Sequence, residues 1–430
     1  LARKAIKADA QHQERLTQEA IKLTGLENPN SVTQLKAWLE EREGIEVESL
    51  NKETLPKLMN QVSPTGRRVL EIRRELSKTS VKKYEAMERA VCSDGRVRGL
   101  FQFYGASRTG RWAGRLVQVQ NLPGTKLPDL KLARDLLKES RFEDIDLLFG
   151  SLPDVLSQLI RTAFIPSPGK KLLVCDYSAI EARVIAWLAG EEWRLDVFRG
   201  HGKIYEASAS QMFKVPIEQI TKGSELRMKG KIAELALGYQ GGPGALISMG
   251  ALDMGLKEEE LPELVRAWRK ANPKIVKFWY DVGDAALTAV KEKRPVKLQY
   301  GIAFIPEAGI LFLQLPSGRR LAYAKPRIEI DERFGKECLT YIGDNTRLKT
   351  YGGKLTENIV QATARDCLAE ALKRLDAAGY DIVAHVHDEI IAEGDGPIEE
   401  MERIMSEPIS WAPGLPLAAD GFETEFYRKD

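Results

Sequence analysis

The stretch KKLLVCDYSAIEARVIAWLAG, residues 170–190, predicts a buried strand that runs directly into a helix. The apolar run ends at Asp176, so a carboxylate is expected at the carboxyl end of the strand, where ligands can reach it. One or two such carboxylates, completed by water and phosphate oxygens, suit a hard cation such as Mg²⁺. A local alternative exists, because Ser178 and Glu181 have the S-x-x-E spacing of a helix capping box.

A second acidic segment, AHVHDEIIAEG, predicts two short strands with Asp388 and Glu389 in the tight turn between them. Turn chemistry alone would accept an aspartate there. The flanks are apolar, and His385 and His387 share one strand face, so the carboxylates would lie at the edge of a buried sheet. Asp176 and Asp388 are far apart in the sequence, and only folding could join them into a two-carboxylate metal site.

A cationic stripe lies in SELRMKGKIAELALGYQGG, where helical spacing puts Arg227, Lys231, Leu235 and Tyr239 on one face. Two cations four residues apart repel weakly, so the placement is favourable if an anion such as a triphosphate binds or if the face is well solvated. The second alternative is supported by Glu234, three residues after Lys231. The sequence leaves both readings open.

A basic region extends from residue 67 to residue 126, with fourteen basic residues against five acidic ones and with aromatic and amide side chains interleaved. Such a surface can follow a phosphate backbone, although a solvated helix face is an equal alternative. Within this region, RTGRWAGRLVQVQNLPG supplies Arg111, Gln120 and Asn121. Arg and Gln can donate to the minor-groove acceptors that base pairs share, whereas the alternative is ordinary loop polarity.

The composition is that of a folded enzyme, with 430 residues of which 43% are hydrophobic and 29% charged. Four widely separated cysteines without a CxxC pair indicate neither a zinc knuckle nor a disulfide framework. No apolar run is long enough to predict a membrane span. The start, LARKAIKADAQHQ, lacks the apolar core of a signal peptide, and we expect a fragment of a longer chain.

The periodicity predicts helices up to about residue 98, including one that opens with Ser31 as N-cap and a helical stretch over 66–91. Strands and loops follow, and then mostly helices over 190–300. A hairpin turned at 316–318 and a long helix over 356–378 are expected near the end.

Taken in order, these segments resemble the family A DNA polymerases of the bacterial DNA polymerase I type, and most closely the phage-encoded branch. DYSAIEAR is similar to the family's first motif, RMKGKIAELALGYQGG to its second and HVHDE to its third. TGR with QNLP, and ENIVQATARD, are similar to further family segments. The resemblance covers the chain from about residue 67 to the C-terminus, without an acidic exonuclease pattern upstream.

The resemblance implies an α+β right-hand polymerase fold with an antiparallel palm sheet and helical thumb and fingers. The implied reaction is template-directed DNA synthesis, as in DNA replication, in which a nucleotidyltransferase adds deoxynucleotides to a primer 3′-hydroxyl by two-metal-ion transfer and releases pyrophosphate. The implied domains are a thumb at 1–98, a first part of the palm at 99–190, fingers at 191–300 and a second part of the palm, with the acidic hairpin, at 301–430.

The implied cofactors are two Mg²⁺ ions, for which Mn²⁺ can substitute. Primer–template DNA and dNTPs are the implied partners, with replication accessory proteins as further candidates. We expect a monomer that acts in the cytoplasm of a bacterial cell, as during phage infection, and that does not contact a membrane.

The resemblance also implies roles for individual residues. Asp176 and Asp388 would bind the metals and, with Lys231, form the catalytic set, while Arg183 and Glu389 would support the pocket. Glu181 would block a ribose 2′-hydroxyl. The implied nucleotide-binding residues are Arg227, Lys231, Leu235, Tyr239, Glu181 and Tyr205, and the implied DNA-binding residues are Arg111, Gln120, Asn121, Gln361, His387, Lys78, Lys82 and Lys83.

Three positions depart from the family pattern. Leu235 stands where many relatives carry Phe or Tyr, and Tyr205 where many carry a triphosphate-contacting His. The second motif continues Tyr239-Gln240-Gly241 rather than Tyr-Gly. Two rival functions share these features: a single-subunit RNA polymerase, against which Glu181 argues, and a DNA-binding remnant, which would gain from losing carboxylates near phosphates.

Overall fold

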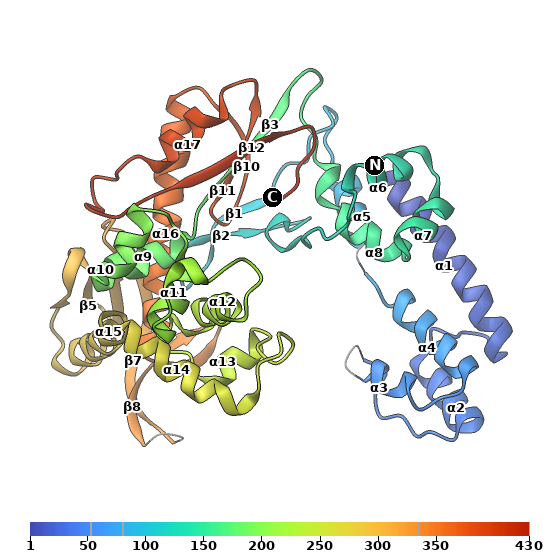
Figure 1. Ribbon diagram of the computed structural model, residues 1–430, viewed down its shortest axis with the longest axis horizontal. Coiled ribbons are helices and arrows are strands. Elements are labelled where there is room, and N and C mark those ends of the chain that lie inside the picture. Colours follow the sequence, from blue (N-terminus) through green and yellow to red (C-terminus); the bar gives the residue numbers. More distant parts are fainter. Residues whose placement is uncertain (52–53, 80, 333–334, 430) are drawn as a thin grey trace. The chain divides into compact units, whose positions relative to one another are not determined.

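The structure is a computed structural model that describes residues 1–51, 54–79, 81–332 and 335–429. The chain forms two compact units, drawn in Figure 1. The first contains Leu1–Gln102, Gly114–Lys171 and Thr424–Asp430, and the second contains Phe103–Ala113 and Leu172–Glu423. These units are defined by compactness alone, so the division into thumb, palm and fingers stays a prediction.

The first unit is built mainly from helices. Ser31 accepts a hydrogen bond from the backbone N–H of Gln34, which confirms it as the N-cap of α2. The predicted helical stretch over 66–91 is divided, since α4 ends at Leu76 and α5 begins at Lys82. The α-helices are α1 (Ala2–Thr24), α2 (Val32–Glu43), α3 (Leu55–Met59), α4 (Pro64–Leu76), α5 (Lys82–Ala90), α6 (Leu130–Glu139), α7 (Phe142–Phe149) and α8 (Leu152–Leu159).

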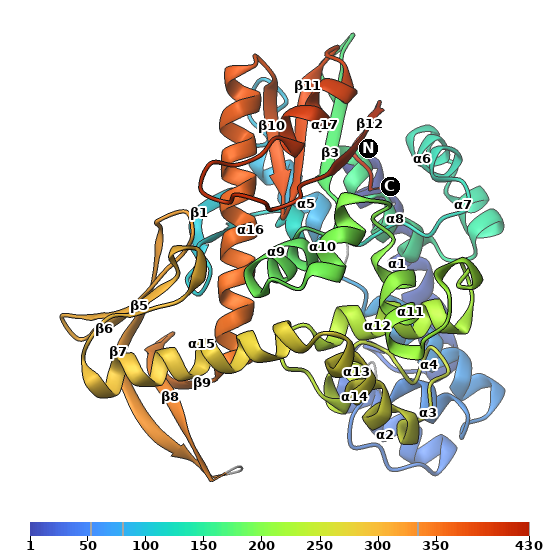
Figure 2. The ribbon, with the colours of Figure 1, turned by 60° about the vertical axis from the view of Figure 1, so that its left-hand side comes forward.

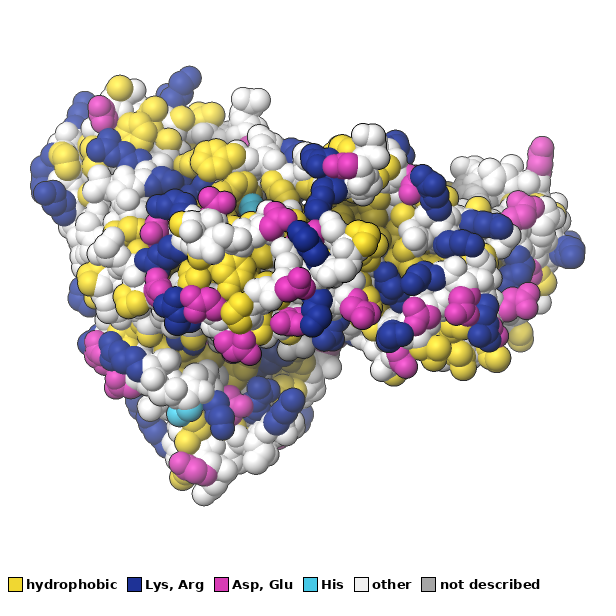
Figure 3. Space-filling model, turned by 90° about the horizontal axis from the view of Figure 1, so that it is seen from above, with side chains coloured by type: hydrophobic (Ala, Val, Ile, Leu, Met, Phe, Trp, Pro, Cys, Tyr) yellow, Lys and Arg dark blue, Asp and Glu magenta, His cyan; other side chains and the backbone are white. Residues whose placement is uncertain are grey.

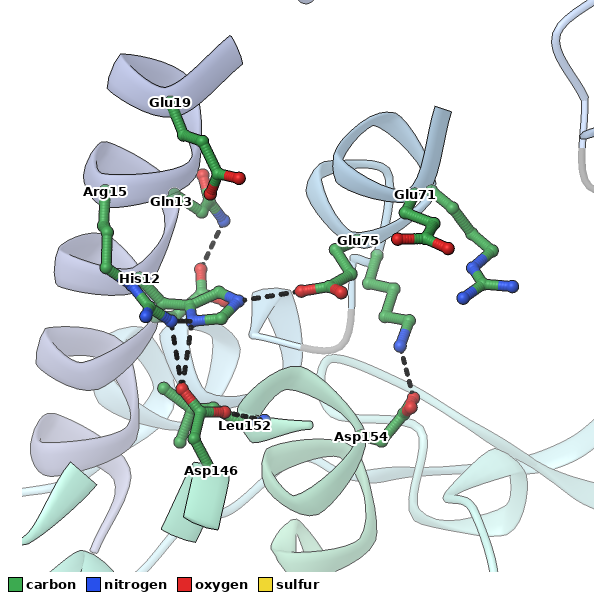
Figure 4. A network of polar contacts seen from close by, with 12 residues as sticks. His12, Gln13, Arg15, Glu19, Glu71, Glu75, Asp146, Leu152 and Asp154 are labelled. Atoms are coloured by element: carbon green, nitrogen blue, oxygen red, sulfur yellow. Dashed lines mark hydrogen bonds and ion pairs between the residues drawn. The ribbon is translucent and has the colours of Figure 1, made fainter. Parts of the chain in front are cut away.

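A buried histidine links three of these helices, as Figure 4 shows. His12 of α1 lies 3.1 Å from a carboxylate oxygen of Glu75 in α4, and this hydrogen bond lowers the pKa of Glu75. Arg15 contacts the Nδ1 atom of His12 at 3.0 Å and Asp146 of α7 at 3.0 Å. Asp146 also accepts from the backbone N–H of Leu152, at the start of α8, at 2.8 Å. Polar contacts therefore supplement the small apolar clusters of this unit.

The strands of the described residues form three sheets, and both predicted hairpins are confirmed. Antiparallel pairing matches Gln314 with Arg320 at one turn and Val386 with Glu389 at the other. One sheet pairs β1 (Phe101–Ala106) with β2 (Arg111–Gly114). A second has the order β10 (Asp381–Val386), β11 (Glu389–Gly394), β3 (Lys171–Tyr177), β12 (Ala419–Thr424), and the third runs in sequence through β4 (Val296–Lys297), β5 (Ala303–Glu307), β6 (Ile310–Gln314), β7 (Arg320–Asp331), β8 (Lys336–Gly343) and β9 (Thr346–Thr350).

The second unit has a large apolar core, and the long helix α16 packs against α9, α15 and α17 (Figure 2). This helix, Gly352–Ala377, begins one turn earlier than the sequence predicts. The mixture of helices with antiparallel sheets confirms the predicted α+β class. The other α-helices are α9 (Ile180–Ala189), α10 (Glu192–Arg199), α11 (Ile204–Phe213), α12 (Glu225–Leu237), α13 (Pro243–Ser248), α14 (Leu261–Ala271), α15 (Pro273–Glu292) and α17 (Ile398–Ser406).

Surface charge is mixed. On the face shown in Figure 3, basic and acidic side chains are interspersed over much of the surface. The formal net charge is +2. None of the helices in the described part of the chain combines the length and apolar character that a bilayer crossing needs.

Helices α11 and α12 approach each other closely at Gly230, and this contact yields a stability prediction. A Cβ atom at Gly230 would lie 2.3 Å from the backbone oxygen of Tyr205 and 3.0 Å from the Cβ of Ala209. We expect Gly230→Ala to lower the free energy of unfolding by about 1–3 kcal/mol, because the two helices must separate. Urea denaturation measures this free energy.

The matched control is Gly244→Ala in α13, where an added Cβ meets nothing within 4 Å. It should leave stability unchanged or raise it by roughly 0.5–1 kcal/mol, because alanine favours the helix. Equal effects of the two substitutions would contradict the close packing of α11 on α12.

Candidate active site

The fold brings the two acidic segments together at one sheet edge. The backbone N–H of Tyr177, the residue after Asp176, donates to the backbone oxygen of Asp388 at 3.2 Å. Strands β3 and β11 are neighbours, so the end of β3 meets the β10–β11 turn. His387 in that turn is exposed and has a left-handed φ of 58°. Tertiary structure therefore brings the backbone beside Asp176 to that of Asp388, whereas their joint binding of a metal stays a prediction.

Carboxylates give this edge a negative potential. Burial, and next the carboxylates of Glu402 and Asp176, raise the pKa of the Cys175 thiol to about 12. Asp420 and the buried Glu389 add to the same effect. Hard cations prefer such oxygen donors, so the residues present fit Mg²⁺. Within the described residues no three His, Cys, Asp or Glu side chains cluster at metal-binding distance, so a bound ion would need further ligands from water or phosphate.

A cavity of about 300 Å³ lies beside the acidic edge. It is lined by residues of the β3–α9 turn, of helices α9, α10, α11, α12 and α14 and of the segment just after α12, together with Asp388. A cavity bordered by acidic, aromatic and apolar groups is a typical place for a small-molecule ligand. Five of the residues predicted for the site line it: Glu181, Tyr205, Leu235, Tyr239 and Asp388.

Glu181 is shared between two donors from other segments. Arg111 donates to one carboxylate oxygen at 2.6 Å, and the hydroxyl of Tyr239 donates to the other at 2.7 Å. Helix α9 has Ala179 as its N-cap and no side-chain capping bond. The capping-box alternative for Ser178 and Glu181 is therefore wrong, because the carboxylate of Glu181 faces tertiary partners. Burial, and next the charge of Glu181, raise the pKa of Tyr239 well above its usual value, so its phenol stays a donor.

The predicted cationic stripe lies on α12, which Ser224 caps by accepting a hydrogen bond from the backbone N–H of Arg227 at 3.3 Å. The Arg227 side chain donates to Glu206 at 2.6 Å. Its guanidinium also lies 5.6 Å from the centre of the Tyr205 ring, a cation–π contact. Two residues assigned to the nucleotide from sequence thus contact each other.

Lys231 is exposed, and no ion pair joins it to another residue in the described part of the chain. The proposed neutralising partner, Glu234, is engaged elsewhere. Its carboxylate is buried in an ion pair with Arg194 of α10 and accepts from the indole N–H of Trp268 at 3.0 Å. The solvated-face alternative therefore loses the support of Glu234.

Two further predicted residues support the site in different ways. Arg183 is buried, and it donates to the backbone oxygens of Ser178 at 2.6 Å and Pro416 at 3.1 Å, which holds the β3–α9 turn against the C-terminal segment. Gln361 of α16 accepts a hydrogen bond at its backbone oxygen from Arg111 at 3.4 Å.

The remaining predicted residues belong to the first unit. Gln120 and Asn121 lie in a short 3-10 helix, Val119–Asn121. Lys78 donates to Asp154 at 2.6 Å, and Lys83 donates to the backbone oxygen of Val117 at 2.8 Å. Lys82 is exposed. Two of the three lysines assigned to the DNA backbone thus have partners within their own unit.

Sequence reasoning missed an aromatic and cationic cluster under the TGR turn. The guanidinium of Arg365 lies 4.2 Å from the ring centre of Trp112 and 5.2 Å from that of Phe103, and it donates to the backbone oxygen of Gly110 at 3.1 Å. The His385 ring lies 4.7 Å from Trp112, and burial, then Arg365, lowers its pKa to about 4. Helical spacing could have indicated Arg365, since it follows the predicted site residue Gln361 by four positions and so lies on the same helix face.

Known proteins are similar to this chain in sequence and in fold. A model of DNA polymerase family A matches residues 2–297. The DNA polymerase of Bacillus phage SP02 is 67% identical, with 100% of this chain and 68% of that protein covered. DNA polymerase I of Pseudomonas aeruginosa is 25% identical over 54% of this chain and 22% of its own length.

A solved structure has the same fold. It is the POL domain of Pol1 from M. smegmatis, in complex with DNA primer-template and dNTP. The TM-score is 0.65, the sequences are 18% identical, and the match covers 99% of this chain and 66% of that one. At this identity the likeness shows the fold, and the predicted right-hand polymerase fold is confirmed.

The sequence matches point to one class of enzyme, the DNA-directed DNA polymerases. Within that class, the chain belongs to DNA polymerase family A, and the predicted resemblance to the phage-encoded branch is confirmed.

Proposed function

We propose that this polymerase extends a DNA primer on a template, joining each deoxynucleotide to the primer 3′-hydroxyl with release of pyrophosphate. The observation that carries the proposal is the meeting of Asp176 and Asp388, through the hydrogen bond from Tyr177 to Asp388, beside the cavity lined by Glu181 and Tyr239. The site thus combines a place for cations with a place for a nucleotide.

Asp176 and Asp388 would hold two Mg²⁺ ions, for which Mn²⁺ can substitute. When bound, the metals would lower the pKa of the primer 3′-hydroxyl and carry the charge of the triphosphate and of the leaving pyrophosphate. The two carboxylates come from adjacent strand ends whose backbones are hydrogen-bonded, so they are held in place before a substrate arrives. Buried Glu389 maintains the negative potential at the turn.

The cationic face of α12 would receive the triphosphate. Lys231 is exposed, four residues after Arg227, and would act on the phosphates directly. Arg227 is held by Glu206 and Tyr205, so its guanidinium has one defined place before an anion competes for it. Tyr205 would act through this stacking rather than as the His that many relatives carry.

Glu181, Tyr239 and Leu235 would shape the space for the sugar and base. The carboxylate of Glu181 is fixed by Arg111 and Tyr239, so its stem occupies one position in the cavity wall. A fixed group of this kind excludes a ribose 2′-hydroxyl by its volume, which favours deoxynucleotides. Leu235 offers an aliphatic, half-exposed surface beside it.

Contacts with the duplex would come from both units. Arg111 is the best placed in the second unit, because it joins Glu181 to the backbone of Gln361 and so connects the nucleotide cavity with α16. Arg183 would keep the β3–α9 turn in shape. The other residues that we propose for DNA binding are Gln120, Asn121, Gln361, His387, Lys78, Lys82 and Lys83.

The proposed domain division is a thumb at 1–98, palm at 99–190 and 301–430, and fingers at 191–300. The proposed partners are primer–template DNA, dNTPs and replication accessory proteins. We propose that the enzyme acts as a monomer in the cytoplasm of a bacterial cell, as during infection by a phage such as those that encode its relatives.

Primer extension in Mg²⁺ tests the proposed chemistry. Asp176→Asn and Asp388→Asn should each lower the extension rate by about a thousandfold, because loss of a metal ligand removes roughly 4 kcal/mol of transition-state stabilisation. Primer–template affinity, measured separately, should stay within a few-fold of the wild type. Asp395→Asn, at an exposed position just beyond β11, is the matched control and should extend normally. More than a tenth of the wild-type rate in either site variant would contradict the metal assignment.

Nucleotide choice tests the role of Glu181. Glu181→Ala should raise the ratio of ribonucleotide to deoxynucleotide kcat/KM by at least about tenfold, because discrimination is a difference between two transition states. Glu181→Gln keeps the volume of the side chain and should retain most of the discrimination. Single-turnover incorporation gives both ratios. If Glu181→Ala lowers the melting temperature but rejects ribonucleotides as well as the wild type does, Glu181 only supports the fold.

Two lysines on α12 provide a matched pair. Lys231→Ala should raise the half-saturating dNTP concentration and lower the maximal rate, because it removes a free cation from the triphosphate face. Lys229 is ion-paired with Glu225 at 2.8 Å and Glu260 at 3.1 Å, so Lys229→Ala should leave both parameters near wild type. A nucleotide titration compares them, and equal behaviour of the two variants would favour a solvated face.

A further inference from the structure

The residue after Tyr239 departs from the family pattern, and its backbone is strained. Gln240 has a left-handed φ of 64°, which glycine adopts freely but which costs a residue with a Cβ atom. The chain accepts this strain at a position that carries a side chain rather than at a glycine. That side chain is therefore expected to make a contact that glycine cannot make.

The contact is a hydrogen bond to the beginning of α16. The side-chain oxygen of Gln240 accepts from the backbone N–H of Gly353 at 3.0 Å. The first N–H groups of a helix have no acceptor within the helix, and the N-cap residue of α16, Tyr351, makes no side-chain capping bond. Gln240 thus caps α16 from a distant part of the chain.

The segment around Gln240 is held from other sides as well. The indole N–H of Trp279 in α15 donates to the backbone oxygen of Gly238 at 2.8 Å, and Arg269 of α14 donates to that of Gly241 at 3.1 Å. At Gly241 a Cβ atom would lie 2.1 Å from the backbone oxygen of Ala236. The loop that follows α12 therefore has little freedom to move independently of its neighbours.

The beginning of α16 is equally confined. A Cβ at Gly352 would lie 2.0 Å from the backbone oxygen of Trp279, and one at Gly353 would lie 2.5 Å from the Cβ of Gln240 and 2.6 Å from the backbone oxygen of Tyr239. The helix end is thus packed between α15 and the Tyr239–Gln240 backbone. A shift of this helix end must displace Tyr239, and a shift of Tyr239 must displace the helix end.

These contacts close a ring of hydrogen bonds that includes two residues lining the cavity, Glu181 and Tyr239. Tyr239 donates to Glu181, Glu181 accepts from Arg111, and Arg111 donates to the backbone of Gln361 on α16. Helix α16 returns to the start of the ring through the bond between Gly353 and Gln240. Gln240 is the link between the end of α12 and the helix that carries Gln361.

We propose that Gln240 is a positioning residue that holds Tyr239 in register with α16 and thereby sharpens the choice between correct and incorrect nucleotides. It lies outside the residues that line the cavity, so it acts through Tyr239 and not on the substrate. The proposal rests on the proposed function, since its readout is nucleotide choice.

Three substitutions distinguish the effect of the Gln240 side-chain hydrogen bond from the effect of the strained backbone. Gln240→Ala removes the acceptor and keeps the strained φ, Gln240→Gly removes the acceptor and relieves the strain, and Gln240→Glu keeps an acceptor beside a helix N-terminus, where negative charge is favourable. We expect the Ala and Gly variants to lose about tenfold in the ratio of matched to mismatched kcat/KM, which corresponds to about 1.4 kcal/mol. The Glu variant should retain the wild-type ratio.

Hydrogen exchange gives a second readout that does not depend on activity. The amide of Gly353 should exchange about tenfold faster in the Ala and Gly variants and at the wild-type rate in the Glu variant, because only the first two free this N–H group. Ser31→Ala is the matched control: it removes the capping bond to Gln34 in the first unit and should lower stability without changing nucleotide choice.

Several results would overturn the inference. One is a wild-type selectivity ratio in Gln240→Gly, and another is a Glu variant that behaves like the Ala variant. Faster exchange at Gly353 with unchanged selectivity would reduce Gln240 to a helix cap. If the wild type itself shows no Mg²⁺-dependent primer extension, the proposed function fails instead, and exchange at Gly353 still decides whether Gln240 caps α16.

Discussion

The arrangement of the site depends on the two hydrogen bonds that the carboxylate of Glu181 accepts. This carboxylate accepts from Arg111 at 2.6 Å and from Tyr239 at 2.7 Å, and so joins the TGR turn, the start of α9 and the end of α12. A half-buried charge with two donors is more favourable than one left without partners. These two hydrogen bonds help to hold the three segments in their relative positions.

The acidic and the basic residues of the site lie on different elements. Burial, and next the carboxylates of Glu402 and Asp176, raise the pKa of Cys175 at the acidic sheet edge to about 12, whereas α12 carries Arg227 and Lys231. The acidic edge would attract a cation and the basic face of α12 a polyanion. The buried ion pair of Arg194 and Glu234 adds no net charge to the site, because each partner neutralises the other.

Close backbone packing provides the rigidity that such a site needs. Gly230, Gly241 and Gly352 lie where a Cβ atom would approach a backbone oxygen to 2.3 Å or less. The buried aromatic pair of Trp268 and Trp279, stacked at 5.9 Å between ring centres, extends this packing through α14 and α15. Helices that touch at their backbones transmit displacement instead of absorbing it in side-chain rotamers. The glycines therefore serve positioning as well as turns.

The sequence by itself determined the local elements and the chemical types at the site. The strand and helix around Asp176, both hairpins and most of α16 were predictable because side-chain periodicity and turn chemistry act over a few residues. Partner choice was decided only by tertiary structure. Glu181 matched a capping box locally, yet it binds residues 70 and 58 positions away, and Glu234 pairs with Arg194, 40 positions away, rather than with Lys231. A carboxylate has equally good partners nearby and far away in sequence, and burial of the surrounding helices selects the distant ones.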